Sequence, residues 1–203
     1  MYIIDNQYFP SINYYYTLLK NLNIEIVEYE VFKKSTFRNR CIITGSSGMI
    51  SLSIPLKHGR NQKAFYRDVE ICYQEDWQKR HWRSILACYN RSAFFDHYQS
   101  VLQDIFSLKM KFLFDFNWYI QEKMASILRI SLPACCKTEP TPDEVQGDFR
   151  DIYSPQNFKQ FHALGEYIQV FETKHDFIPN LSIVDLLCNL GPDAMNYLRE
   201  KMK

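Results

Sequence analysis

The first 32 residues follow the pattern strand, helix, strand, and this pattern restricts the fold more than any other feature of the chain. The segment MYIID is apolar, and Pro10 in the loop after it prevents further strand pairing. In INYYYTLLKNLN the apolar and aromatic residues recur at helical spacing, and Ser11 is placed to cap this helix. The segment IEIVEYEVF then alternates as a strand does. We therefore expect a βαβ unit, in which the two strands lie parallel.

A hairpin is expected next, because the β-rich runs RNRCIIT and MISLSIPL flank a turn bracketed by Gly45 and Gly48. The turn sequence GSSG could suggest a phosphate-binding loop. Such a loop opens a helix, however, and here a strand follows. The segment YRDVEIC, residues 66–72, predicts one more short strand.

The middle of the chain, from about residue 76 to 130, carries apolar residues at intervals of three and four and is expected to be helical. Asp76 is placed to cap its first helix. Residues 131–155 are rich in proline and acids and predict an exposed loop. Residues 166–171, EYIQVF, read as a further strand.

The C-terminal part predicts a helix that is capped by Ser182 and closed by Gly191, with Pro192 opening the last helix. The predicted fold class is α/β. A mixed sheet is opened by the βαβ unit and has a hairpin extension, and a helical middle segment and C-terminal helices cover it. We expect a single domain over residues 1–203.

Composition excludes several classes of function. Lys and Arg number 24 against 23 Asp and Glu, so the basic excess typical of a nucleic-acid-coating protein is missing. No run approaches the ~18 apolar residues that span a bilayer, and MYIIDNQYF does not resemble a secretory signal. The six cysteines form no C-x-x-C pair, which predicts reduced thiols, a cytoplasmic location and no metal site. No nucleotide, zinc or hydrolase motif occurs, so the sequence names no cofactor.

Arg38, Asn39 and Arg40 are the first candidate site. On a strand the two arginines share a face and lie roughly 6.5 Å apart, a spacing that suits a bound phosphate or carboxylate. Glu28 and Glu30 also share a face of the preceding strand, so the arginines could instead pair with these acids. Solvated surface charge is a third interpretation, and the sequence leaves all three open.

Other polar residues are candidates on position alone. Lys34 either belongs to a surface pair with Lys33 or points into the same pocket as the arginines. Gln7 and Tyr8 follow the first strand, at the edge where open α/β sheets bind ligands. Gln7 could position a ligand or make an ordinary loop hydrogen bond.

His81 lies among large apolar residues of the predicted helix WQKRHWRSILACY. It is either a core histidine or a general acid or base, since imidazole titrates near neutrality. Cys88 is two turns away, about 10 Å along the axis, which is too far for a Cys–His pair. A thiol enzyme that uses Cys41 or Cys88 is therefore a minor alternative.

These motifs, taken together and in their order, resemble the WbqC-like protein family over nearly the whole chain. The resemblance is carried by QYFPSINYY, FRNRCII, ISLSIPL, DWQKRHWRSILACYNRSAFFDHY and YIQVFETKHDFIPNLSIVDLLCNLGPDAMNYL. The positions that match the family pattern are Gln7, Phe9, Pro10, Lys34, Arg38, Asn39, Arg40, Leu52, Ser53, Ile54, Pro55, Trp77 and His81. Where the family often has Ala-Pro-aromatic-Phe, this chain has SAFF.

The resemblance implies a bacterial, cytoplasmic protein of a family named from a surface-polysaccharide (O-antigen) gene cluster. The expected function is an enzyme that modifies an activated sugar precursor, for example by acyl or aminoacyl transfer to an amino sugar. Arg38 and Arg40 would hold a small anionic ligand, such as a nucleotide sugar or an acyl donor. His81 would accept a proton, and Gln7 or Tyr8 would orient the acceptor. The alternative is a non-catalytic binding or scaffold protein in a biosynthetic complex.

Overall fold

A computed structural model describes residues 1–21, 23–161 and 164–200 of the chain. The βαβ unit is confirmed: β1 (Tyr2–Asp5), α1 (Ile12–Lys20) and β2 (Ile24–Val27) follow one another, and β1 and β2 are parallel with Tyr2 opposite Ile24. The four-stranded sheet has the order β5-β2-β1-β6, and every pair in it is parallel. The α/β class is therefore confirmed.

Both edge strands of this sheet come from the segment for which we expected an exposed loop. β5 (Ala134–Cys136) pairs with β2, and β6 (Gly147–Asp148) pairs with β1. Residues 137–144 between them are mostly exposed, as the composition predicts. The composition does not reveal the strands, because two- and three-residue strands depend on pairing with distant segments.

The predicted hairpin is present as β3 (Arg40–Gly45) and β4 (Gly48–Ser53). It forms a two-stranded sheet of its own and adds no strand to the parallel sheet. Gly48 has φ +102°, a left-handed conformation that suits glycine in a tight turn.

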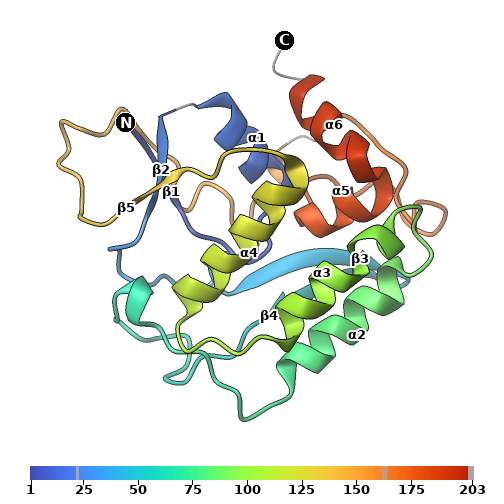
Figure 1. Cartoon of the computed structure of the whole chain (residues 1–203), viewed down its shortest axis with the longest axis horizontal. Coiled ribbons are helices and arrows are strands. Elements are labelled where there is room, and N and C mark those ends of the chain that lie inside the picture. The colour runs from blue at the N-terminus through green and yellow to red at the C-terminus, as the bar shows by residue number, and fades with distance from the viewer. Residues whose placement is uncertain (22, 162–163, 201–203) are drawn as a thin grey trace.

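The helices cover the two sheets (Figure 1). Helices α2 and α3 pack against each other, α2 and α5 contact β3, and α1 contacts α6. The bounds are α2 (Trp77–Tyr89), α3 (Phe95–Ser107), α4 (Leu113–Leu128), α5 (Ile183–Leu190) and α6 (Ala194–Glu200), with short 3-10 turns at Tyr66–Asp68, Phe158–Gln160 and Gly191–Asp193. Within the described ranges no helix combines the length and apolar character needed to cross a bilayer.

The caps at the two ends of α5 agree with the sequence pattern, but the predicted N-cap bond of α2 does not form. The Ser182 hydroxyl accepts a hydrogen bond from the Val184 N–H, and Gly191 ends α5 with φ +56°. Asp76 occupies the N-cap position of α2 but makes no side-chain cap bond there. Its carboxylate instead binds Lys79 at 2.9 Å.

Two strands that the sequence predicts are absent from the structure. Residues 66–72 form a 3-10 turn followed by isolated bridges at Glu70 and Ile71. Residues 166–171 contain no strand. Their alternation is real, because Tyr167 and Gln169 point inward, but both side chains bond the Asp185 carboxylate, at 2.5 and 3.3 Å.

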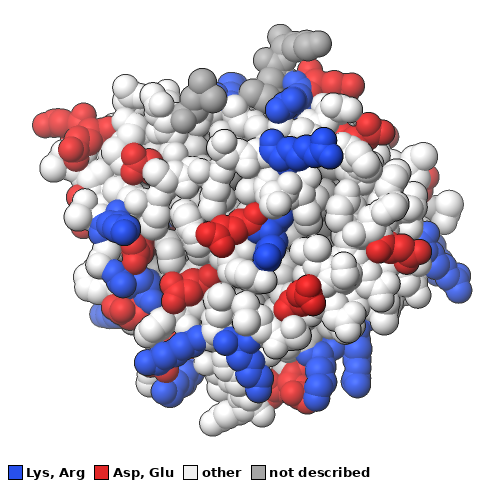
Figure 2. All heavy atoms as spheres, viewed as in Figure 1, with Lys and Arg blue, Asp and Glu red and all other residues white. Residues whose placement is uncertain are grey.

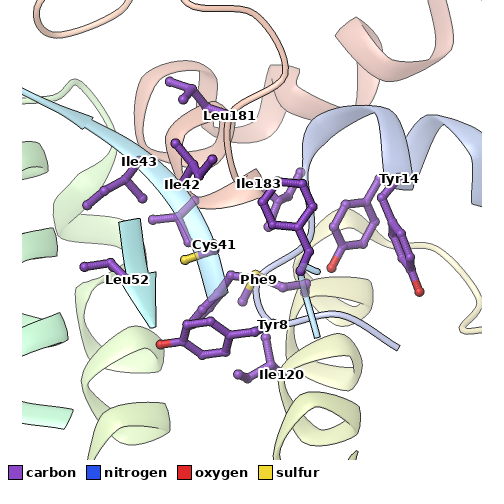
Figure 3. Close-up of a cluster of buried hydrophobic side chains, with 14 of the residues drawn as sticks. Tyr8, Phe9, Tyr14, Cys41, Ile42, Ile43, Leu52, Ile120, Leu181 and Ile183 are labelled. Carbon is purple, nitrogen blue, oxygen red and sulfur yellow. The ribbon is translucent and has the colours of Figure 1, made fainter. Parts of the chain in front are cut away.

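The core lies where the hairpin, the loop after β1 and α4 meet. Figure 3 shows Tyr8 and Phe9 from that loop, Cys41 to Ile43 from β3 and Ile120 from α4 in one cluster. The Tyr8 ring stacks on Phe116 of α4, with 6.3 Å between the ring centroids. The loop after β1 is therefore packed into the core.

Candidate functional site

Arg38 lies at the carboxyl end of the parallel sheet and is fully buried. Its guanidinium makes a two-pronged contact with Glu30: Nε to Oε1 is 2.7 Å and Nη2 to Oε2 is 2.8 Å. Nη1 also bonds Asp151 and lies 3.6 Å from Asp5 Oδ2. Gln7 donates to that Asp5 oxygen at 3.1 Å. We call Asp5, Glu30, Arg38 and Asp151 the Arg38 cluster.

The electrostatics of the Arg38 cluster reflect three carboxylates around one guanidinium. Burial raises the pKa of Asp5 and of Glu30 above the ordinary carboxyl value, although Arg38 acts against this shift. Burial also disfavours charge on Arg38, but Asp5, Glu30 and Asp151 together outweigh it and raise the pKa of the guanidinium. For half-buried Asp151, Arg38 and Lys33 outweigh burial and lower the pKa.

The predicted pair of arginines on one strand face does not form, because β3 begins only at Arg40. Arg38 lies in the turns before the strand and points into the interior. Its pairing with Glu30 confirms one of the interpretations that the sequence left open. Glu28 instead pairs with Arg67, at 3.0 Å.

Tyr8 and His81 form a second buried group. The Tyr8 hydroxyl lies 2.9 Å from His81 Nδ1, and His81 is only 5% exposed. Burial lowers the pKa of His81 to about 4, so the imidazole is neutral near pH 7. The Trp77 and Phe106 rings pack edge-on against His81. These contacts are those of a core histidine.

Lys34 is the predicted site residue that lines an open pocket. The pocket has a volume of about 360 Å³, and we call it the basic pocket; its lining residues are Phe32, Lys33, Lys34, Arg60, Asn61 and Gln62. Lys34 Nζ donates to Asn61 Oδ1 at 3.1 Å. Lys33 Nζ binds Asp151 Oδ2 at 2.5 Å, which connects the basic pocket to the Arg38 cluster.

Arg40, the other predicted cation, is not among the residues that line this pocket. Burial lowers the pKa of Arg40, and the charge of Arg60 acts in the same direction. Arg40 Nε is buried and has no hydrogen-bond partner in the described structure. Among the described residues, Lys34, Arg40 and Arg60 take part in no ion pair with an acid.

Comparison with known proteins places the chain in a family. The model of the WbqC-like protein family matches residues 6–148 and 144–197. The chain belongs to the WbqC-like protein family. No curated protein and no solved structure matches it.

Asn39 and Gln7, two further predicted site residues of this WbqC-like chain, also make contacts inside the protein. Asn39 Nδ2 donates to the Ile54 carbonyl at 2.9 Å, which closes the base of the hairpin. Gln7 is buried and bonds Asp5, as above. Gln7, Tyr8, Arg38, Asn39 and His81 are thus all buried side chains with partners inside the protein.

The buried thiols are not activated. Burial raises the pKa of Cys88 to about 11 and raises the pKa of Cys41 as well. No group of three or more His, Cys, Asp or Glu in the described residues has the arrangement of a metal site. Nothing in these contacts favours the thiol alternative for this WbqC-like protein.

The sequence reasoning missed Arg60, Asn61 and Gln62, which line the basic pocket. A signal was present, because the segment KHGRNQK, residues 57–63, has three Lys or Arg and no acid. Elsewhere the charges are mixed, and Figure 2 shows acidic and basic side chains interspersed over one face of the molecule. A local excess of positive charge in a balanced chain is therefore the pattern to look for.

Proposed function

We propose that this WbqC-like protein binds the phosphate or carboxylate group of a small anionic precursor in the basic pocket. We propose that the protein takes part in the modification of surface-polysaccharide precursors in the bacterial cytoplasm. Nucleotide sugars and acyl donors, which carry phosphate or carboxylate groups, are ligands of this kind. The observation that carries the proposal is that Lys34 and Arg60 line one pocket and neither has an acidic partner in the described residues.

The chemistry of the pocket supports an anion. A guanidinium presents a planar fork of donors to phosphate or carboxylate oxygens, and an ammonium adds a mobile point charge. The side-chain amide of Asn61 supplies a further donor, whereas that of Gln62 donates to the Gly59 carbonyl at 2.7 Å.

A binding role is favoured over the transfer reaction considered from the sequence. The Tyr8–His81 pair is buried, and neither residue lines the basic pocket. A general base must reach the proton that it removes. Arg38, the other family arginine, is engaged by three carboxylates and supports the sheet edge beside the pocket.

The test is titration calorimetry with pyrophosphate at low ionic strength. We expect Arg60→Ala and Lys34→Ala each to weaken binding by about tenfold, because each removes a charge-assisted contact. Arg91→Ala is the matched control, since Arg91 is exposed and lies outside the pocket. Absence of pyrophosphate binding, or equal weakening by Arg91→Ala, would contradict the proposal.

A further inference from the structure

An exposed aromatic ring lies beside the basic pocket. Phe65 is 53% exposed and Val31 is 50% exposed, and they stand opposite each other in an antiparallel bridge. The bridge is held by hydrogen bonds from the Phe32 N–H to the Ala64 carbonyl, 3.0 Å, and from the Tyr66 N–H to the Glu30 carbonyl, 2.7 Å. Phe65 is therefore an exposed large apolar side chain on a backbone that is fixed on both sides.

The same two paired segments lead directly into the basic pocket. Beyond the bridge, one segment continues to Lys33 and Lys34, and the other comes from Arg60 to Gln62. Val31 and Lys33 are exposed while Phe32 between them is buried, so the two exposed side chains lie on one side of the chain. Val31, which stands opposite the ring, is three residues from Lys34, roughly 10 Å of extended chain, and Phe65 itself is five residues from Arg60.

We propose that this surface binds a nucleoside phosphate, with the phosphates in the basic pocket and the base stacked on Phe65. The inference rests on the proposed function and names the class of its ligand. Bases stack on exposed aromatic rings because every base has a π-face, and cations beside the ring hold the phosphates.

Alternative ligands fit this surface less well. Inorganic phosphate or a simple carboxylate would use the cations and leave Phe65 exposed. A bilayer surface would require a larger apolar face than Phe65 and Val31 provide. Nucleotide sugars and coenzyme A thioesters share a base and a diphosphate, so both sources meet the requirement, and the ligands of the test distinguish them.

The experiment titrates pyrophosphate, UDP, ADP and coenzyme A into the protein and four variants, one of which is the Arg60→Ala variant of the previous test. We expect UDP, or ADP and coenzyme A, to bind more tightly than pyrophosphate. Phe65→Ala should weaken nucleotide binding by at least about fivefold, with pyrophosphate binding unchanged. Phe65→Trp should keep the nucleotide affinity, because it keeps an aromatic face. Ile168→Ala is the control, since Ile168 is 74% exposed and lies in another segment.

The failure of this inference differs from the failure of the proposed function. One outcome is that Arg60→Ala weakens pyrophosphate binding but every nucleotide binds only as tightly as pyrophosphate. Another is that Phe65→Ala leaves nucleotide binding unchanged. Either outcome overturns the base site and leaves the anion site standing. If neither pyrophosphate nor any nucleotide binds, both are overturned. Nucleotide binding that is lost in Phe65→Ala but retained in Arg60→Ala also contradicts the arrangement proposed here.

Discussion

Arg38 connects segments that are far apart in the chain, because its guanidinium contacts Asp5, Glu30 and Asp151. Breaking a buried ion pair by removing one partner costs more than the pair contributes, since the other charge stays buried without compensation. The sequence could suggest Glu30, eight residues away, as a partner. It could not indicate Asp151, 113 residues away, because nothing local connects the two.

Replacing Arg38 by Met should therefore lower the free energy of unfolding by about 3–5 kcal/mol. Arg80→Met is the matched control, because the side chains of Arg80 and its partner Glu75 are 61% and 65% exposed. The control should cost at most about 1 kcal/mol. Both are measured by urea unfolding. Adding Glu30→Gln to Arg38→Met should recover part of the loss, and equal losses for the two single variants would show that the Arg38 cluster is not a buried support.

His81 predicts a pH dependence of stability. Its folded-state pKa of about 4 lies below the ordinary value of 6.5, so the unfolded chain binds the proton more readily between these values. The contribution of His81 is fully present above pH 6.5 and is lost as the pH falls toward 4, by on the order of 3 kcal/mol.

The measurement compares the unfolding free energy of the protein and of His81→Gln from pH 7 to pH 4. Asp185 acts in the opposite direction in part of this range, because burial raises its pKa to about 6, but its contribution is common to both proteins. The difference between them should therefore shrink as the pH falls. A constant difference would mean that His81 is solvated and titrates normally.

At the level of elements, the periodicity of the sequence predicted those helices and strands whose formation depends on contacts between residues near one another in the chain. The βαβ unit, the hairpin and the helices from 76 to 130 have strong repeats and formed as expected. The edge strands β5 and β6 were missed, because their two or three residues are defined only by pairing with β2 and β1. In residues 166–171, buried and exposed side chains alternate because Tyr167 and Gln169 turn inward to bond Asp185, and not because the segment pairs in a sheet.

The junction after α5 gives a prediction at the same scale. Gly191 has φ +56°, and a Cβ added to it would lie 2.4 Å from ring atoms of Phe94, next to the start of α3. Gly59 has φ +68° but open space around its Cβ position. Gly59→Ala should cost about 1 kcal/mol for the backbone conformation alone. Gly191→Ala should cost at least about 2 kcal/mol more, because the Phe94 ring must move and because Gly191, with ψ −126°, lies outside the left-handed region that alanine can adopt.

Thermal or urea unfolding of these two variants measures the difference between the two sites. If both substitutions lower the free energy of unfolding equally, the Phe94 ring moves aside at no measurable cost. If Gly191→Ala costs clearly more, the turn before α3 and the end of α5 pack as one unit. The Phe94 N–H, which donates to the Cys188 carbonyl at 3.0 Å, leads us to expect the second result.

For the molecule as a whole, Asp151 joins the sheet edge to the basic pocket. It bonds Arg38 in the interior and Lys33 at the pocket wall, and its own N–H donates to Asp5 at 3.2 Å. Its φ of +60° is a left-handed conformation that asparagine also tolerates. Asp151→Asn therefore removes the charge and preserves the backbone conformation.

Two effects of opposite sign should follow from Asp151→Asn. Stability should fall by about 1–3 kcal/mol, because Arg38 loses one of its carboxylates. Pyrophosphate should bind roughly two- to fivefold more tightly at low salt, because Lys33 no longer has a competing carboxylate, and the gain should shrink as salt is added. Asp143→Asn is the control, since Asp143 is an exposed acid of the same loop region. Lower stability with unchanged pyrophosphate affinity would mean that Lys33 takes no part in the anion site and that the Arg38 cluster serves the fold alone.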